Sequence, residues 1–408
     1  MYKIIFFNFF HLFTNIMFNS KILLIERQIE MNIKINNKDD IILKILHYFI
    51  TEEDYKPVII NGLDNEIWLE NMEKDLQLIR INTNYIHNSE QLKNDMYKVK
   101  TIMRSIKKST LSLRMNVLNL LLDTNEDINM KDTKDFKHVE TIKVDKINDF
   151  KKNKIVSDFF PNVKNNIMND KMDPVDFFKL TDDMNQKTMK NEKKLAKIFS
   201  QKKPIMTYLL IVINVMLFLI STIYPSIQIY LGNNYLFVQD GEIYRLFTCM
   251  FLHSNLMHLL FNMYALYVLG PQVERYYGKA KFLTIYFVSG LLGSVFSCVF
   301  MPENAISIGA SGAIFGLLGS IAYFTYYYRA TLQNALRNQV MPVILINLIL
   351  GFVVADIDVF AHIGGLIGGL LISMGIGIGD KGRKSDQING IIVLILMFIF
   401  MFYMTFNK

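Results

Sequence analysis

The sequence predicts a polytopic, all-α bundle of membrane helices that follows a small soluble α/β domain. Of the 408 residues, 51% are hydrophobic, which is high for an ordinary soluble protein, and yet 20% are charged. The charges are concentrated before about residue 203, whereas from Pro204 onward they shrink to short clusters between long apolar runs. The two halves are therefore suited to different solvents, water for the first and a lipid bilayer for the second.

The second half contains seven apolar runs, each with the length of about 17 to 25 residues that crosses a bilayer core of about 30 Å. They lie at about 204–224, 255–273, 281–301, 309–327, 339–355, 361–379 and 388–406. We expect the first six to form one bundle over residues 204–380. The seventh follows a short cytoplasmic loop within residues 381–408.

Lysine and arginine predict the orientation of the bundle, because basic residues concentrate in cytoplasmic loops. The loops after the second, fourth and sixth runs are basic, and a lysine-rich stretch precedes the first run. The opposite loops hold Arg245 as their one basic residue, beside Asp240, Glu242, Glu303, Asp356 and Asp358. We therefore expect a multi-pass protein of the cell membrane whose amino-terminal half is cytoplasmic.

The amino-terminal half begins with an apolar segment and a predicted domain. Residues 1–30 are interrupted by asparagine and histidine, which makes a poor signal peptide or anchor, and either Met1 or Met31 is the true start. Residues 31–139 predict the α/β domain, with helices near 39–49 and 89–107 and strands near 58–61, 66–70 and 76–82. A turn at 62–65 joins the first two strands as a hairpin, and Trp68 alternates like a core residue.

Residues 140–203 are rich in lysine and aspartate and have weak periodicity, which indicates a charged, flexible linker. The α/β domain before it carries no catalytic motif. A binding or regulatory role and an inert folding unit both stay open for that domain, and its ligand is unknown.

Composition and motifs exclude several kinds of function. The net charge of +7 suggests nucleic acid, but the lysines are scattered rather than gathered beside aromatic platforms, so we expect no such partner. Cys249 and Cys298 give no metal-ligand spacing, and no H-E-x-x-H motif occurs. We expect neither a metal nor a cofactor. The string 377–380 matches the GxGD of intramembrane aspartyl proteases, but no other predicted span contains a second aspartate.

Four polar side chains are predicted to meet at one level inside the membrane. Runs two, four and six all enter from the outer face, so Ser311 and His362, which lie near the start of the fourth and sixth runs, share one depth. His258 and Asn262 are four residues apart and lie on one face of the second run. Histidine inside a membrane is costly and usually marks a function.

This constellation suits hydrolysis of a peptide bond by a serine nucleophile and a histidine base. Close approach of the fourth and sixth helices is supplied by small residues, Gly312 and Gly316 on one and Gly365 and Gly369 on the other. The Ser311 N–H, in the first helical turn, is available to an oxyanion, and His258 and Asn262 add side-chain donors. Packing alone also explains the glycines, and an interhelical polar contact also explains His258 or Asn262.

The second half resembles the rhomboid intramembrane serine proteases. The matching strings are Gly309-Ala310-Ser311-Gly312, Ala361-His362 followed by Gly365 and Gly369, the H-x4-H-x3-N spacing of His253, His258 and Asn262, Tyr244-Arg245 in the first outer loop, and Glu274 with Gly278. The resemblance implies a Ser311–His362 dyad, an oxyanion hole of His258, Asn262 and the Ser311 amide, and transmembrane protein substrates cleaved near their outer ends.

Two positions depart from that family's pattern. Tyr244 replaces the usual tryptophan, and Phe315 stands where some members carry a tyrosine that packs on the catalytic imidazole. We expect Phe315 to keep this stacking. The alternative function is a catalytically silent membrane adaptor that binds transmembrane helices, with Ser311 and His362 merely packed.

Overall fold

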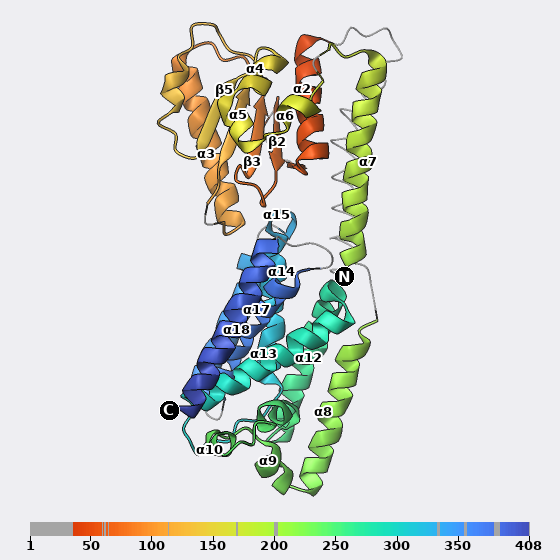
Figure 1. Ribbon diagram of the computed structural model, residues 1–408, viewed down its shortest axis with the longest axis vertical. Coiled ribbons are helices and arrows are strands. Elements are labelled where there is room, and N and C mark those ends of the chain that lie inside the picture. The colour runs from red at the N-terminus through yellow and green to blue at the C-terminus, as the bar shows by residue number, and fades with distance from the viewer. Residues whose placement is uncertain are drawn as a thin grey trace. The chain divides into compact units, whose positions relative to one another are not determined.

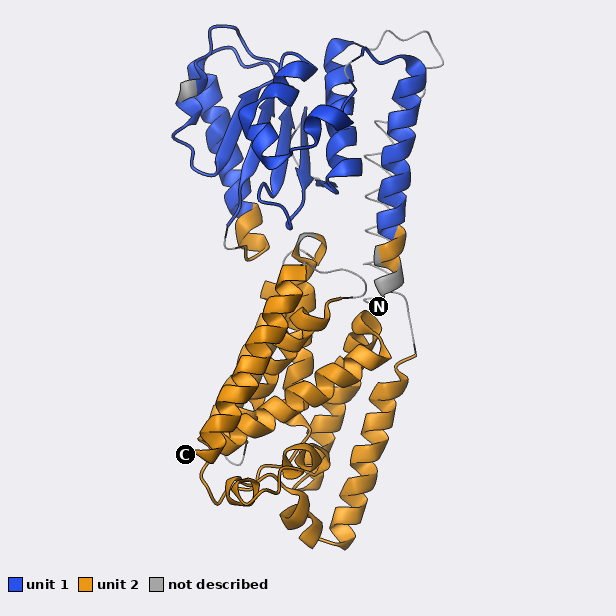
Figure 2. Ribbon diagram, viewed as in Figure 1, with its two compact units in different colours: residues 1–105, 113–192 blue, residues 106–112, 193–408 orange. Residues whose placement is uncertain are grey.

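The computed structural model forms two compact units, residues 1–105 with 113–192 and residues 106–112 with 193–408 (Figure 2). The described residues run from 36 to 407, without 59, 61, 62, 64, 113, 169, 200–202, 333, 334, 355, 356 and 379–383. The predicted apolar segment 1–30, half of the predicted turn at 62–65, Asp356 and the end of the GxGD string lie outside them.

A five-stranded sheet organises the first unit, in the order β1 to β5 (Figure 1). The strands are β1 (Lys56–Val58), β2 (Glu66–Glu70), β3 (Leu78–Asn82), β4 (Val117–Leu121) and β5 (Val139–Lys143). The pairs β1–β2 and β2–β3 are antiparallel, so the predicted hairpin is confirmed, whereas β3–β4 and β4–β5 are parallel. The long helix α3 (Ser89–Ser109) supplies the crossover that the first parallel pair needs.

The helices of the first unit include the two that were predicted, α2 (Asn37–His47) and α3. The rest are η1 (Tyr48–Glu52), η2 (Met130–Thr133), α4 (Ile147–Lys152), α5 (Lys154–Phe159), α6 (Val163–Asn166) and α7 (Pro174–Phe199). The prediction of a flexible linker from residue 140 is therefore wrong: β5 belongs to the sheet, and Phe150, Val156 and Val163 lie in the core. These short helices bury few residues each, which is why their periodicity is weak.

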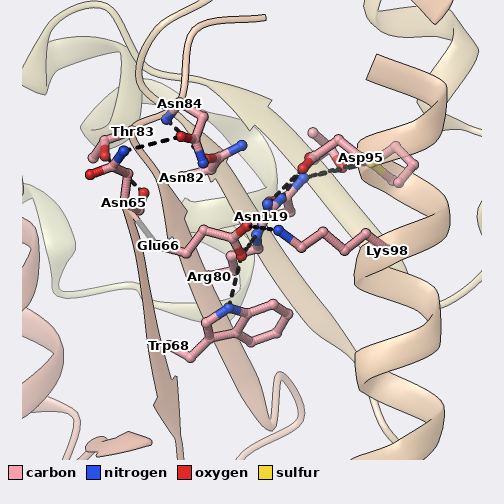
Figure 3. A network of polar contacts seen from close by, with 12 residues as sticks. Asn65, Glu66, Trp68, Arg80, Asn82, Thr83, Asn84, Asp95, Lys98 and Asn119 are labelled. Carbon is pink, nitrogen blue, oxygen red and sulfur yellow. Dashed lines mark hydrogen bonds and ion pairs between the residues drawn. The ribbon is translucent and has the colours of Figure 1, made fainter. Parts of the chain in front are cut away.

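A buried polar network fastens α3 to the sheet (Figure 3). The Arg80 side chain, fully buried, donates two 2.6 Å hydrogen bonds to Asp95 and one of 2.8 Å to Glu66. Lys98 and the Trp68 indole also donate to Glu66. Burial by itself raises the pKa of Glu66, but the hydrogen bonds from Arg80 and Lys98 outweigh it and lower that pKa to about 2. The carboxylate is therefore ionised and paired.

The second unit is helical. Its long helices are α8 (Ile205–Ile223), α12 (Leu256–Tyr277), α13 (Lys279–Phe300), α14 (Ser311–Tyr327), α16 (Met341–Val353), α17 (Val359–Ile376) and α18 (Lys384–Phe406). Short helices fill the connections, namely α9 (Ser226–Leu231), α10 (Tyr235–Gln239), α11 (Arg245–Thr248), η3 (Cys249–Phe251), α15 (Arg329–Leu332) and η4 (Leu336–Val340). Every predicted apolar run thus coincides with one long helix.

Five helical stretches among the described residues are long and apolar enough to cross a membrane: Ile205–Ile223, Lys279–Phe300, Leu336–Val353, Val359–Ile376 and Lys384–Phe406. The chain is therefore a multi-pass membrane protein. The helix α14 has only 17 residues, and α12 carries Glu274 and Arg275 near its end. A total of seven spans stays a prediction.

The helix α14 lies at the centre of the bundle, against α12, α13 and α17, and α18 runs beside α17 (Figure 1). The outward face of α16 is apolar and exposed, with Phe352 and Val353 more than half accessible. Such a face is costly in water and stable in lipid, so the bundle is built for a bilayer.

Candidate active site

The candidate nucleophile, Ser311, is the first residue of α14 and is half-buried. The first N–H groups of a helix lack intrahelical partners, and the helix dipole favours negative charge there. The residue two positions earlier, Gly309, has φ +134°, a backbone conformation that side-chain-bearing residues rarely adopt. This turn leads directly into α14, so that Ser311 lies at the amino-terminal end of the helix.

The predicted glycines form the contact between α14 and α17. A Cβ placed on Gly365 would lie 1.9 Å from the carbonyl oxygen of Gly312, and one on Gly369 would lie 1.9 Å from that of Gly316. Both distances are far below any real contact, so only glycine allows the two backbones to touch here. The helices that begin with Ser311 and carry His362 are therefore held in direct backbone contact.

The candidate base, His362, lies in the first turn of α17 and is 7% exposed. Its imidazole stacks on the Phe315 ring, with centroids 4.1 Å apart and planes 13° apart. Among the described residues its Nδ1 has no hydrogen-bond partner. Because Phe315 is four residues after Ser311, both project from the same face of α14, the face that meets the imidazole.

The predicted oxyanion donors converge on the segment that precedes Ser311. A Cβ on Gly309 would lie 2.7 Å from His258 Nε2 and 3.6 Å from Asn262 Nδ2. The other ring nitrogen of His258 is 3.1 Å from the Ser254 hydroxyl. In the described part of the chain, the buried Asn262 Nδ2 has no partner. Two side-chain nitrogens thus lie beside the turn that leads to Ser311.

The two remaining predicted residues lie elsewhere. Arg245 is buried in the connection between α8 and α12, where it donates to the carbonyls of Ile229 (2.5 Å) and Gly232 (3.0 Å) and covers the Phe237 ring at 4.3 Å. It holds that connection together.

Glu274 lies at the opposite end of α12 from His258, and 16 residues of helix separate them by about 24 Å. Its carboxylate accepts from the backbone N–H groups of Met206 and Thr207 at 3.0 and 2.9 Å. This buried cap satisfies the amino terminus of α8, so Glu274 supports the bundle and is remote from the candidate site.

Sequence reasoning missed three residues beside the site. Asp358 was predicted to be a loop residue, but it caps α17 through a 2.9 Å hydrogen bond from the Ala361 N–H. Its other oxygen accepts from Ser307, whose backbone pairs with that of Asn233. An aspartate directly before an apolar helix is a capping signal that indicates this role, because its carboxylate can accept from the N–H three residues later.

His253, which belongs to the predicted histidine motif, is fully buried with its ring 5.1 Å from that of His258. Its carbonyl accepts from the side chain of Gln228, in α9, at 3.0 Å. The described residues contain no group of three or more His, Cys, Asp or Glu side chains arranged to hold a metal. The candidate site brings together a hydroxyl, an imidazole and a set of N–H donors.

Comparison with known proteins places this arrangement in a family. A family model described as a rhomboid domain matches residues 240–378. The putative rhomboid protease YdcA of Bacillus subtilis is 35% identical over 136 residues, which are 33% of this chain and 68% of that protein. The chain belongs to the rhomboid family. The resemblance predicted from the motifs is therefore confirmed, and the rhomboid match contains every candidate site residue from Arg245 to Gly369.

Two further rhomboid relatives match over a smaller share of their own length. Rhomboid protease GluP of Bacillus subtilis is 36% identical over 215 residues, 51% of this chain and 42% of that protein. RHOMBOID-like protein 7 of Arabidopsis thaliana is 41% identical over 136 residues, 33% of this chain and 43% of that protein. The chain thus spans less than half the length of either relative.

Proposed function

We propose that this protein is an intramembrane serine endopeptidase in which Ser311 is the nucleophile and His362 the base. The observation that carries the proposal is the stacking of the His362 imidazole on Phe315, four residues after Ser311 on the same face of α14. An imidazole inside a membrane bundle is costly, and here it packs on the helix whose first residue is Ser311. Membership of the rhomboid family supports the same chemistry.

In the proposed reaction, the Ser311 hydroxyl attacks the scissile carbonyl carbon while His362 accepts its proton. The negative charge that develops on the carbonyl oxygen is stabilised by the Ser311 N–H and by His258 and Asn262. His362 then protonates the leaving amine, and the peptide carbon stays on Ser311 as an ester. Water, deprotonated by His362, hydrolyses this ester and restores both residues.

The proposed substrates are transmembrane segments of other membrane proteins, cut near the outer face of the cell membrane. The site lies at the starts of α14 and α17, and the connections on that side carry few basic residues, which supports an outward-facing site and a cytoplasmic amino-terminal half. A substrate helix must unwind to present a carbonyl, so glycine or proline near its outer end will favour cleavage.

The test is cleavage of a labelled transmembrane peptide by the full-length protein in liposomes. Ser311→Ala and His362→Ala should each reduce the rate by about 10⁴-fold or more, as in other serine–histidine enzymes. The matched control is Ser320→Ala: Ser320 is on the same helix, and its hydroxyl donates to the Leu317 carbonyl, 2.7 Å away. It should cleave like the unaltered protein.

Two results would refute the proposal. If the peptide is still cleaved at the original rate after Ser311 or His362 is replaced, the two residues do not form a catalytic dyad. An unaltered protein that binds the peptide and never cuts it indicates the silent adaptor instead.

A further inference from the structure

A hydrogen-bonded bridge joins the segment before Ser311 to the start of the His362 helix. The Ser307 hydroxyl donates to Asp358 Oδ2 at 2.6 Å, and Asp358 Oδ1 accepts from the Ala361 N–H at 2.9 Å. Ser307 lies four residues before Ser311, and Asp358 lies four residues before His362. The bridge therefore stands at the same distance along the chain from the nucleophile and from the base.

The backbone of Ser307 is held by the connection between α8 and α12. The Ser307 N–H donates to the Asn233 carbonyl at 2.8 Å, and the Asn233 N–H donates to the Ser307 carbonyl at 3.0 Å. Asn233 is itself 1% exposed, and its side-chain amide donates to the Ser294 carbonyl of α13 at 2.9 Å. Ser307 is thus anchored to α13 through this connection and to α17 through Asp358.

The glycine contact between α14 and α17 does not by itself fix the position of one helix along the axis of the other. Small-residue faces set how closely two helices approach, but they present few side chains that resist sliding along the axis. A hydrogen bond to a carboxylate is shorter and stronger than a neutral one, and at a helix start it also satisfies a free N–H group. A bridge at the two helix starts therefore fixes their relative level.

We infer that Ser307 and Asp358 are positioning residues that hold the Ser311 hydroxyl and the His362 imidazole at one level. This inference rests on the proposed peptidase function. Neither residue acts on the substrate: Ser307 orients the turn that enters α14, and Asp358 orients the first turn of α17. Their removal should slow chemistry and leave substrate capture intact.

Four variants of the full-length protein test the bridge, through kcat and KM for a transmembrane peptide in liposomes. Ser307→Ala and Asp358→Ala should each lower kcat about tenfold, with KM within about twofold of the original. Ser307→Thr keeps the hydroxyl, and Asp358→Asn keeps an acceptor for the Ala361 N–H and a group that bonds Ser307. Both conservative variants should retain most of the rate.

The double variant Ser307→Ala with Asp358→Ala should be no slower than the slower single one, because both remove one bridge. Thr222→Ala is the matched control, since the exposed Thr222 hydroxyl donates to the Phe218 carbonyl of its own helix. It should leave kcat unchanged.

Three results would contradict the positioning role. The first is an unaltered kcat in both alanine variants, and the second is a loss in the double variant that equals the product of the single losses. The third is an equal loss of kcat in the alanine and the conservative variants. Failure of the peptidase proposal looks different. In that case the unaltered protein itself does not cleave, or it cleaves without Ser311.

Discussion

The contact between α14 and α17 gives a sharp prediction for Gly365→Ala. The new methyl carbon would lie 1.9 Å from the Gly312 carbonyl oxygen, whereas ordinary contacts begin at 3.4 Å. The obstacle is backbone, so the helices must separate by about 1.5 Å, at a cost of about 1 to 3 kcal/mol in unfolding free energy. Displacing a nucleophile from its base by about 1 Å costs about a hundredfold in rate. We therefore expect kcat to fall about a hundredfold in a protein that still folds.

Two measurements on the full-length protein check this expectation. Peptide cleavage in liposomes gives kcat, and reaction of a thiol dye with Cys249 and Cys298 reports unfolding, since both are buried in the bundle. Thr222→Ala on α8 is the control: its hydroxyl is exposed and bonds the Phe218 carbonyl of its own helix, so rate and stability should hold. A Gly365→Ala protein with unaltered kcat and unfolding temperature would refute the argument from backbone contact.

Three further outcomes are expected. Phe315→Leu should lower kcat about fivefold through loss of stacking on His362, while Phe315→Tyr keeps the rate; equal rates for both would contradict this. Arg245→Ala leaves two loop carbonyls unpaired and should lower the unfolding free energy of the bundle by about 2 kcal/mol, seen as earlier thiol exposure on heating. The folded-state pKa of Glu66, about 2, lies below its ordinary 4.5. Its contribution of about 2 kcal/mol is thus complete above pH 4.5 and is lost as the pH falls toward 2. Fluorescence of Trp68, the only tryptophan, should show this loss during urea unfolding, and Glu66→Gln should abolish it.

The helices of the bundle were predictable because lipid demands long apolar runs, and each predicted run coincides with a helix of the structure. The glycine contact was predictable too, since small residues recur every four positions on both helices. In the first unit, β2 and α3 follow clear periodic patterns, and their predicted ranges agree with the structure.

The rest of the first unit depends on contacts that are distant in sequence. The strand β4 is buried on both faces, so its five residues show no alternation, and β5 was hidden inside a charged stretch. The helices after β5 bury only scattered residues such as Phe150 and Val163. So few buried residues in a short segment do not predict a helix until the sheet against which they pack is known.

The candidate site divides in the same way. Residues with costly chemistry in a membrane, above all His258 and His362, stand out in the sequence. The bridge from Ser307 to Asp358 spans 51 residues and uses a serine and an aspartate that look ordinary in the connections between helices. Its detection required the spatial pairing of the two segments.

The most direct test of the account is covalent capture of the nucleophile. The full-length protein in liposomes is treated with a fluorophosphonate, which modifies activated serines, and the modified residue is found by mass spectrometry. We predict modification at Ser311, abolished in Ser311→Ala and greatly slowed in His362→Ala. A chain that stays unmodified, carries the label on another serine, or labels Ser311 equally fast without His362 would contradict the proposed dyad.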